Sequence, residues 1–99
     1  MSQYDVYRPK GSDVPVVDCQ SDVLAHLPTR FVIAMLPIDK APVPAERFNP
    51  VLSFAGADYQ LSPQYVASLS MTELGEPVGS LAGDHHAIVT AIDFLIGGY

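Results

Sequence analysis

The segment from His85 to Ile96 is the most tightly constrained part of the chain. It contains no proline or glycine, and Gly97 and Gly98 follow it directly. Because proline and glycine interrupt helices, this stretch predicts a helix of about three and a half turns that ends at the two glycines. Asp84 precedes it, where its carboxylate is expected to accept the free amides of the first turn.

The predicted helix has an apolar face that spans an arc of roughly 160°, wide enough to pack on a sheet. That face consists of Ile88, Val89, Ala91, Ile92, Leu95 and Ile96. Phe94 falls outside the arc, and a large aromatic side chain there indicates that a second copy of the chain covers this side. We predict Phe94, together with its neighbour Leu95, as the dimer-interface residues. The alternative is that the helix is covered on both sides within its own domain.

The rest of the chain has the patterns of strands and turns. The expected strands are Gln3–Arg8, Pro15–Cys19, Arg30–Leu36, Val51–Phe54, Tyr59–Leu61, Tyr65–Met71 and a short edge strand at Val78–Leu81. The first two are expected to form an antiparallel hairpin, and Arg30–Leu36, which is almost entirely apolar, should be the most buried strand. Between Pro37 and Pro50 the four prolines predict a long loop, which we expect to contact a partner.

Charge is distributed unevenly along the 99 residues. The net charge is -6, and all five basic residues precede Phe48. A C-terminal half without lysine or arginine would be repelled by phosphate backbones, so direct nucleic-acid binding by that half is disfavoured. The longest apolar run is too short to span a membrane, and the N-terminus lacks an export signal. We therefore expect a single soluble, cytoplasmic domain, and the apolar fraction of 48% favours an oligomer.

Catalytic and metal-binding patterns are weak. Cys19 is the only cysteine, so it cannot form an intramolecular disulfide, and adjacent His85 and His86 cannot chelate from one helix face. Cys19 with His26 could serve as nucleophile and base, but no third orienting group is marked. We predict no catalytic residue, no metal site and no cofactor, and hence a protein that is not an enzyme.

Several short strings in a fixed order resemble the CcdB family of bacterial toxins. They are Gln20-Ser21-Asp22, Pro28, Arg30, Val32-Ile33, Pro50-Val51, Gly75-Glu76, Val78, Leu81, Ile88, Ala91-Ile92 and Gly98. The resemblance runs nearly from end to end and implies a single CcdB-like toxin domain over residues 1–99. The implied fold is mainly β with a C-terminal α-helix, a twisted antiparallel sheet with the SH3-like barrel character of CcdB and MazF. A small additional sheet and a symmetric homodimer are also implied.

The resemblance further implies a role in a type II toxin–antitoxin system. CcdB-like toxins bind the A subunit of DNA gyrase and trap it on cleaved DNA. A CcdA-like antitoxin neutralises the toxin and joins it in repressing their operon, so this chain would meet DNA only indirectly. Carried over by position, the gyrase-binding residues are Val23, Leu24, Asp93, Ile96, Gly97, Gly98 and Tyr99. The antitoxin-binding residues are Arg8, Lys10, Lys40, Arg47 and Phe48, and the charge of the four basic side chains suits an acidic tail.

Two alternatives stay open. The family pattern carries a tryptophan near its C-terminus that is expected to stack on a gyrase arginine, and Gly97 stands at that position here. A family member with a lost or shifted target is therefore one alternative. The other is a MazF-like endoribonuclease, which shares the barrel but needs acid–base groups and a basic RNA groove.

Overall fold

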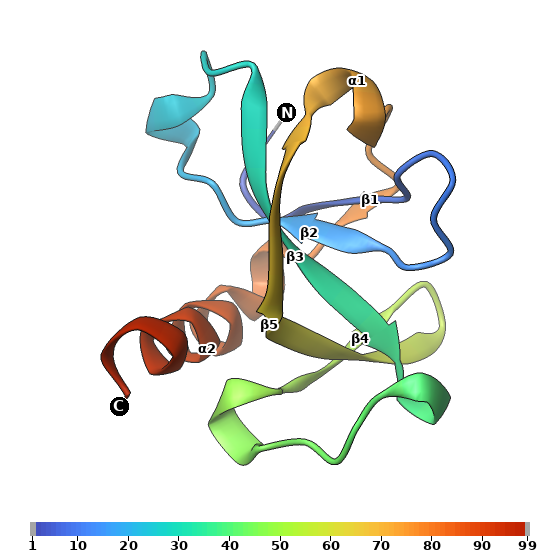
Figure 1. Cartoon of the computed structure of the whole chain (residues 1–99), viewed down its shortest axis with the longest axis vertical. Helices are drawn as coiled ribbons and strands as arrows, with labels where there is room; N and C mark the ends of the chain where they lie inside the picture. The colour runs from blue at the N-terminus through green and yellow to red at the C-terminus, as the bar shows by residue number, and fades with distance from the viewer. Residues whose placement is uncertain (1, 99) are drawn as a thin grey trace.

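The structure is a computed structural model that describes residues 2–98, apart from the side chain of residue 46. In that part of the chain one antiparallel sheet has the strand order β4-β5-β3-β2-β1-β6. The strands are β1 (Asp5–Tyr7), β2 (Val16–Asp18), β3 (Thr29–Pro37), β4 (Val51–Phe54), β5 (Ala57–Ser70) and β6 (Gly79–Ser80). A short helix α1 (Met71–Leu74) follows β5, and α2 (His85–Gly97) ends the fold (Figure 1). The predicted mainly β fold with a C-terminal helix is confirmed.

Strand β5 is one long strand rather than the two that the sequence predicted. Its register against β3 shifts between Ile33 and Ala34, whose partners are Val66 and Ser62. The intervening residues 63–65 bulge out of the ladder, and β5 bends sharply there (Figure 1). Proline cannot donate to a sheet ladder, so Pro63 marks the bulge and not a strand end. The small additional sheet implied by the resemblance is not separate, because the distal halves of β3 and β5 simply continue the main sheet.

The two edge strands of the sheet, β4 and β6, meet where the Phe54 side chain packs on Gly79. Phe54 of β4 lies so close to Gly79 of β6 that a Cβ on Gly79 would stand 2.5 Å from the ring. The sheet therefore curls into a half-barrel whose ends touch at this contact, which explains the barrel character that the resemblance implied.

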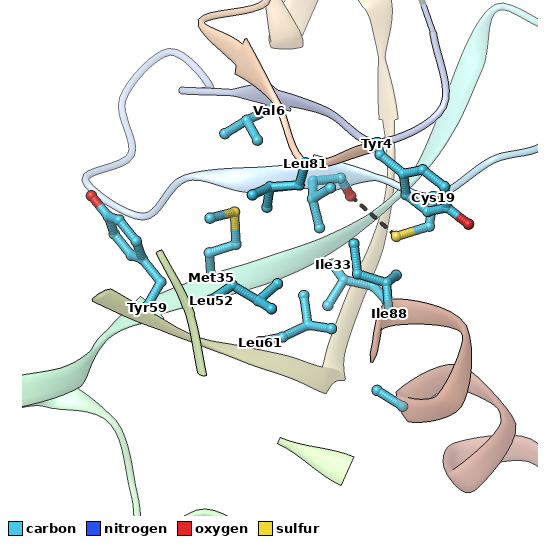
Figure 2. Close-up of a cluster of buried hydrophobic side chains, with 12 residues drawn as sticks. Tyr4, Val6, Cys19, Ile33, Met35, Leu52, Tyr59, Leu61, Leu81 and Ile88 are labelled. Carbon is cyan, nitrogen blue, oxygen red and sulfur yellow. Dashed lines mark hydrogen bonds between the residues drawn. The ribbon is translucent and has the colours of Figure 1, made fainter. Parts of the chain in front are cut away.

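The main core lies inside this curl and is covered on one side by α2. Val6, Val17 and Ile33 of neighbouring strands belong to this core. Ile88 of α2 belongs to it too and lies beside Ile33 (Figure 2). Tyr4 adds to this core with a left-handed φ of 72° and holds the start of α2, because its hydroxyl lies 2.6 Å from Nδ1 of His85. Burying such apolar side chains contributes about 1.5 to 3 kcal/mol each.

The opposite face of the sheet carries a second, smaller core that contains an ion pair. Arg30 Nε donates to Asp18 Oδ2 at 2.8 Å, and both side chains are fully buried. Leu74 of α1 is buried in this second core, where it packs with Tyr7. Arg30 is therefore neutralised inside the protein and contributes no charge to the surface.

Helix α2 departs from its predicted contacts at both ends. Asp84 stands at the N-cap position but makes no side-chain capping bond, because the chain enters α2 through a 3-10 turn, Ala82–Asp84, that gives it φ -102° and ψ 18°. Only Ile88 and Ala91 of the predicted apolar face are fully buried, and Ile96 is 79% exposed. The last turn lies away from the strands (Figure 1), so its apolar side chains do not reach the core.

Candidate partner-binding surfaces

The C-terminal end of α2 presents an apolar and acidic surface to solvent. Leu95 is 43% exposed and Ile96 is 79% exposed, while Asp93 is exposed one turn earlier. Gly98 closes the helix in the left-handed conformation, with φ 75°, and its amide donates to the Phe94 carbonyl. These residues make an accessible surface at one end of the helix. Tyr99, the remaining residue predicted to bind gyrase at this end, lies outside the described residues.

The other predicted gyrase-binding residues lie in the turn after β2. Asp22–Leu24 forms a 3-10 turn, where the Ser21 hydroxyl accepts the Val23 amide. Val23 is 83% exposed, and Leu24 is also exposed. This turn lies at the upper left of Figure 1 and the end of α2 at the lower left, well apart. One chain therefore does not bring the two groups of predicted residues together.

The loop between β3 and β4 is ordered by two short turns and one buried amide. The turns are Ile38–Lys40 and Glu46–Phe48. Asn49 is buried, and its Nδ2 donates to the Leu61 carbonyl and to Gln64 Oε1, each at 3.1 Å. Its Oδ1 accepts the Ala45 amide at 3.1 Å. Asn49 thus fixes the end of the loop to the bulge of β5, a role that sequence reasoning missed because an isolated asparagine in a loop gives no sign of burial.

Phe94 packs within its own chain. Its ring centroid lies 6.5 Å from that of Phe48, and the Arg47 guanidinium stands 5.4 Å over the ring. This cation–π contact joins the loop to the helix. The aromatic side chain that suggested a second copy thus has an internal partner. Dimerisation stays a prediction, and the exposed Leu95 side chain is what now supports it.

The predicted antitoxin-binding residues are spread from the hairpin between β1 and β2 to the far end of the loop between β3 and β4. Arg8 Nη2 donates to the Tyr59 hydroxyl at 3.5 Å, where β5 passes the start of the loop. Lys10 and Lys40 are exposed, while Arg47 lies at the other end of the loop beside α2. A partner that met all of these cations would have to follow the loop from the first hairpin to the helix.

The structure does not join Cys19 and His26 into a nucleophile–base pair. Cys19 is buried, and its thiol contacts the Val17 carbonyl at 3.6 Å, the dashed line in Figure 2. Burial and the nearby Asp18 carboxylate raise the pKa of this thiol to about 12, whereas a reactive cysteine needs a lowered pKa. His26 is exposed. Among residues 2–98 no three His, Cys, Asp or Glu side chains converge as metal ligands, and no helix is long and apolar enough to cross a membrane.

Comparison with known proteins identifies the family. A search of curated proteins found no match. The family model described as CcdB protein matches residues 3–98, which is nearly the whole chain. Together with the curled antiparallel sheet and the C-terminal helix, this match shows that the chain belongs to the CcdB family.

Proposed function

We propose that this chain is the toxin of a type II toxin–antitoxin pair and that it inhibits DNA gyrase without catalysing a reaction. Membership of the CcdB family supports a toxin-type role. The observation that carries the gyrase proposal is the exposed end of α2, where Ile96 and Asp93 offer an apolar contact and a negative charge together. Such a surface suits an arginine-bearing groove on the A subunit of gyrase.

The active form that we propose is a homodimer formed through the exposed side of α2. The end of α2 and the turn that carries Val23 and Leu24 are apart in one chain, so a single copy offers gyrase two separate small contacts. A symmetric pair of chains would double both contacts and place them around one axis. Sedimentation of the chain with and without Leu95→Glu tests this arrangement, because a buried glutamate would shift the dimer toward monomer.

We further propose that a CcdA-like antitoxin neutralises the toxin by wrapping an acidic, disordered tail around the basic residues. The exposed cations are Arg8, Lys10, Lys40 and Arg47, while the fifth basic residue is buried against Asp18. A disordered tail can follow a long path of this kind, although ordering it reduces the affinity. Lys40→Glu should therefore weaken neutralisation.

The gyrase proposal is tested by trapping of gyrase on cleaved plasmid. Asp93→Lys should lower the yield of cleaved plasmid, because it reverses the charge that faces the gyrase arginine. Glu76→Lys makes the same charge change at an exposed acid away from α2 and serves as the control. Equal trapping by wild type, Asp93→Lys and Glu76→Lys would refute the placement of the contact at the end of α2.

A second candidate is a CcdB-like toxin with a shifted target. The specific observation in its favour is the Gly97–Gly98 end, which offers no aromatic side chain at these two positions. Under this candidate the chain is toxic when expressed without its antitoxin, yet purified gyrase cleaves plasmid at its basal level. An RNA-cleavage assay run beside the plasmid assay separates a MazF-like endoribonuclease from the gyrase inhibitor and from the toxin with a shifted target.

A further inference from the structure

The distal half of β5 has a free edge. On its outer side β4 pairs only with residues 57–60, before the bulge. Beyond the bulge, residues 66–70 pair with β3 on one side, and no strand in the described part of the chain covers the other. The backbone along this outer side is therefore open to a partner.

The hydrogen bonds of β3 show which backbone groups point to this edge. The Cys19 amide donates to the Phe31 carbonyl at 2.9 Å, so Phe31 faces β2. Neighbouring residues of a strand alternate in direction, so Arg30 and Val32 face β5. Their partners in register are Leu69 and Ala67, whose backbone groups are thereby used.

Val66 and Ser68 consequently direct their N–H and C=O groups outward. Two hydrogen bonds support this assignment of inward-facing and outward-facing residues. The Met71 amide donates toward β3, to the Pro28 carbonyl at 3.3 Å, whereas the Ser70 amide points away from β3 and donates to Glu73 Oε1 at 3.1 Å. Val66 and Ser68, two successive outward-facing residues with Ala67 between them, thus carry free donors and acceptors at the spacing of a β-ladder.

This edge lacks the usual protection against strand pairing. The segment from Tyr65 to Met71 contains no charged residue, proline or glycine, although the chain as a whole carries a net charge of -6. Natural sheets protect exposed edges with lysine, proline or very short strands. The other two edges follow that rule, because Pro50 precedes β4 and β6 has only two residues. An unprotected edge of this length favours a role in binding.

We propose that the outer edge of β5 binds an extended segment of a partner protein as an added β-strand, through the backbone of Val66 and Ser68. Main-chain groups on a strand edge select an extended polypeptide, and the uncharged surroundings favour a segment without charge. We take this segment to be an uncharged stretch of the disordered antitoxin tail, separate from the acidic stretch proposed to meet the basic residues, and this identification alone rests on the proposed function.

A second copy of this chain fits the edge less well than a free peptide. Antiparallel self-pairing centred on Ser68 would place Met71, the first residue of α1, opposite Tyr65 in the bulge of the other copy. At each end of the paired segment, the start of α1 from one copy would then face the bulge of β5 from the other copy, and neither continues a regular ladder. A flexible tail has neither obstacle, so it can pair along the whole open stretch.

The test uses NMR of the full chain with a blocked five-residue peptide of alternating threonine and valine as the probe. At millimolar peptide, the amide signals of Val66 and Ser68 should shift and exchange more slowly with solvent. The same peptide N-methylated at every residue lacks ladder donors and is the control probe. Ser68→Lys keeps the backbone groups but puts a charge on the edge that an added strand would partly desolvate, so binding should weaken about fivefold to tenfold, the equivalent of about 1 kcal/mol. Thr72→Lys adds the same charge on α1 and should bind like wild type.

Shifts that concentrate on β4, equal binding of the methylated peptide, or no shift at all would overturn the proposal. So would concentration-dependent shifts of the Val66 and Ser68 amides without peptide, because they would mean that a second copy occupies the edge. The assay contains neither gyrase nor antitoxin, so its result stands apart from the proposed function.

In a second arm, co-expressed antitoxin from the neighbouring gene should neutralise Ser68→Lys less well than Thr72→Lys, and equal neutralisation would refute the antitoxin as the partner.

Discussion

The contact between the two sheet edges predicts that Gly79→Ala destabilises the fold. An added Cβ would stand 2.5 Å from Cε1 and 2.6 Å from Cζ of Phe54, closer than packed carbon atoms approach one another. Phe54 packs against the main core, so its ring cannot move without disturbing neighbours. Overpacking of this kind costs about 1 to 3 kcal/mol.

Urea and thermal unfolding of the variant measure this cost. For a domain of this size each kcal/mol lowers the melting temperature by about 4 to 8 °C. Gly83→Ala is the matched control, because a Cβ there meets no atom within 4 Å and the residue needs no positive φ. It should change stability by less than about 0.5 kcal/mol. All samples need the same protein concentration, since a dimer melts at a temperature that depends on it.

A double-mutant cycle shows whether Phe54 is the cause. Phe54→Leu alone should cost about 1 kcal/mol through lost burial, but it shortens the side chain that meets residue 79. The pair of changes together should therefore cost less than the sum of the two, by about 1 kcal/mol or more. Additive costs, or a Gly79→Ala variant as stable as Gly83→Ala, would refute the view that the ring closes the half-barrel.

Three further predictions concern buried and titrating groups. Asp18→Ala should lower the free energy of unfolding by about 3 to 5 kcal/mol because it leaves the buried Arg30 without its ion-pair partner. The double variant Asp18→Ala with Arg30→Met should lose less free energy of unfolding than Asp18→Ala alone, and a larger loss in urea unfolding would contradict this. Hydrogen bonds from the Ser70 amide and hydroxyl lower the pKa of Glu73, so its contribution to stability is present above its ordinary pKa of 4.5 and is lost as the pH falls through the lowered value. The melting temperature of wild type should therefore exceed that of Glu73→Gln at pH 7, and a gap that fails to narrow in acid would count against that capping contact. Because burial raises the pKa of Cys19 to about 12, labelling of its thiol at pH 8 should follow the unfolded fraction across a urea titration, and full labelling of the folded protein would show that the thiol is accessible.

Local sequence signals predicted most of the sheet. Gly97 and Gly98 end α2 where expected, and the first hairpin pairs Val6 with Val17 as the alternation implied. These features depend on neighbours in the chain, which a sequence displays directly. The bend of β5 was mistaken for a strand break, because Pro63 has the same local signature in a bulge as at a strand end.

The partner-binding residues were harder to predict because their surroundings come from distant segments. The sequence presents Phe94 as an aromatic on the solvent side of a helix, and only the fold brings Phe48 against it. Arg30 was placed at the start of the most buried strand, but its pairing with Asp18 was not predicted, although it lies two residues before buried Val32 on the same face of β3. Residues two apart in a strand share a face, so Arg30 shares one with Val32 and Asp18 shares one with Val16. That pattern was the signal that could have revealed the buried pair.

The anchoring of the long loop by Asn49 has a practical consequence. Pro42, Val43 and Pro44 are exposed and take no part in hydrogen bonds among the described residues, while Phe48 and Asn49 fasten the chain a few residues further on. Lengthening a flexible loop costs little, with about 0.6 kcal/mol for each doubling. A fluorophore or an epitope tag inserted at Val43 should therefore leave the barrel intact and give a reporter placed beside the residues that are proposed to meet the antitoxin.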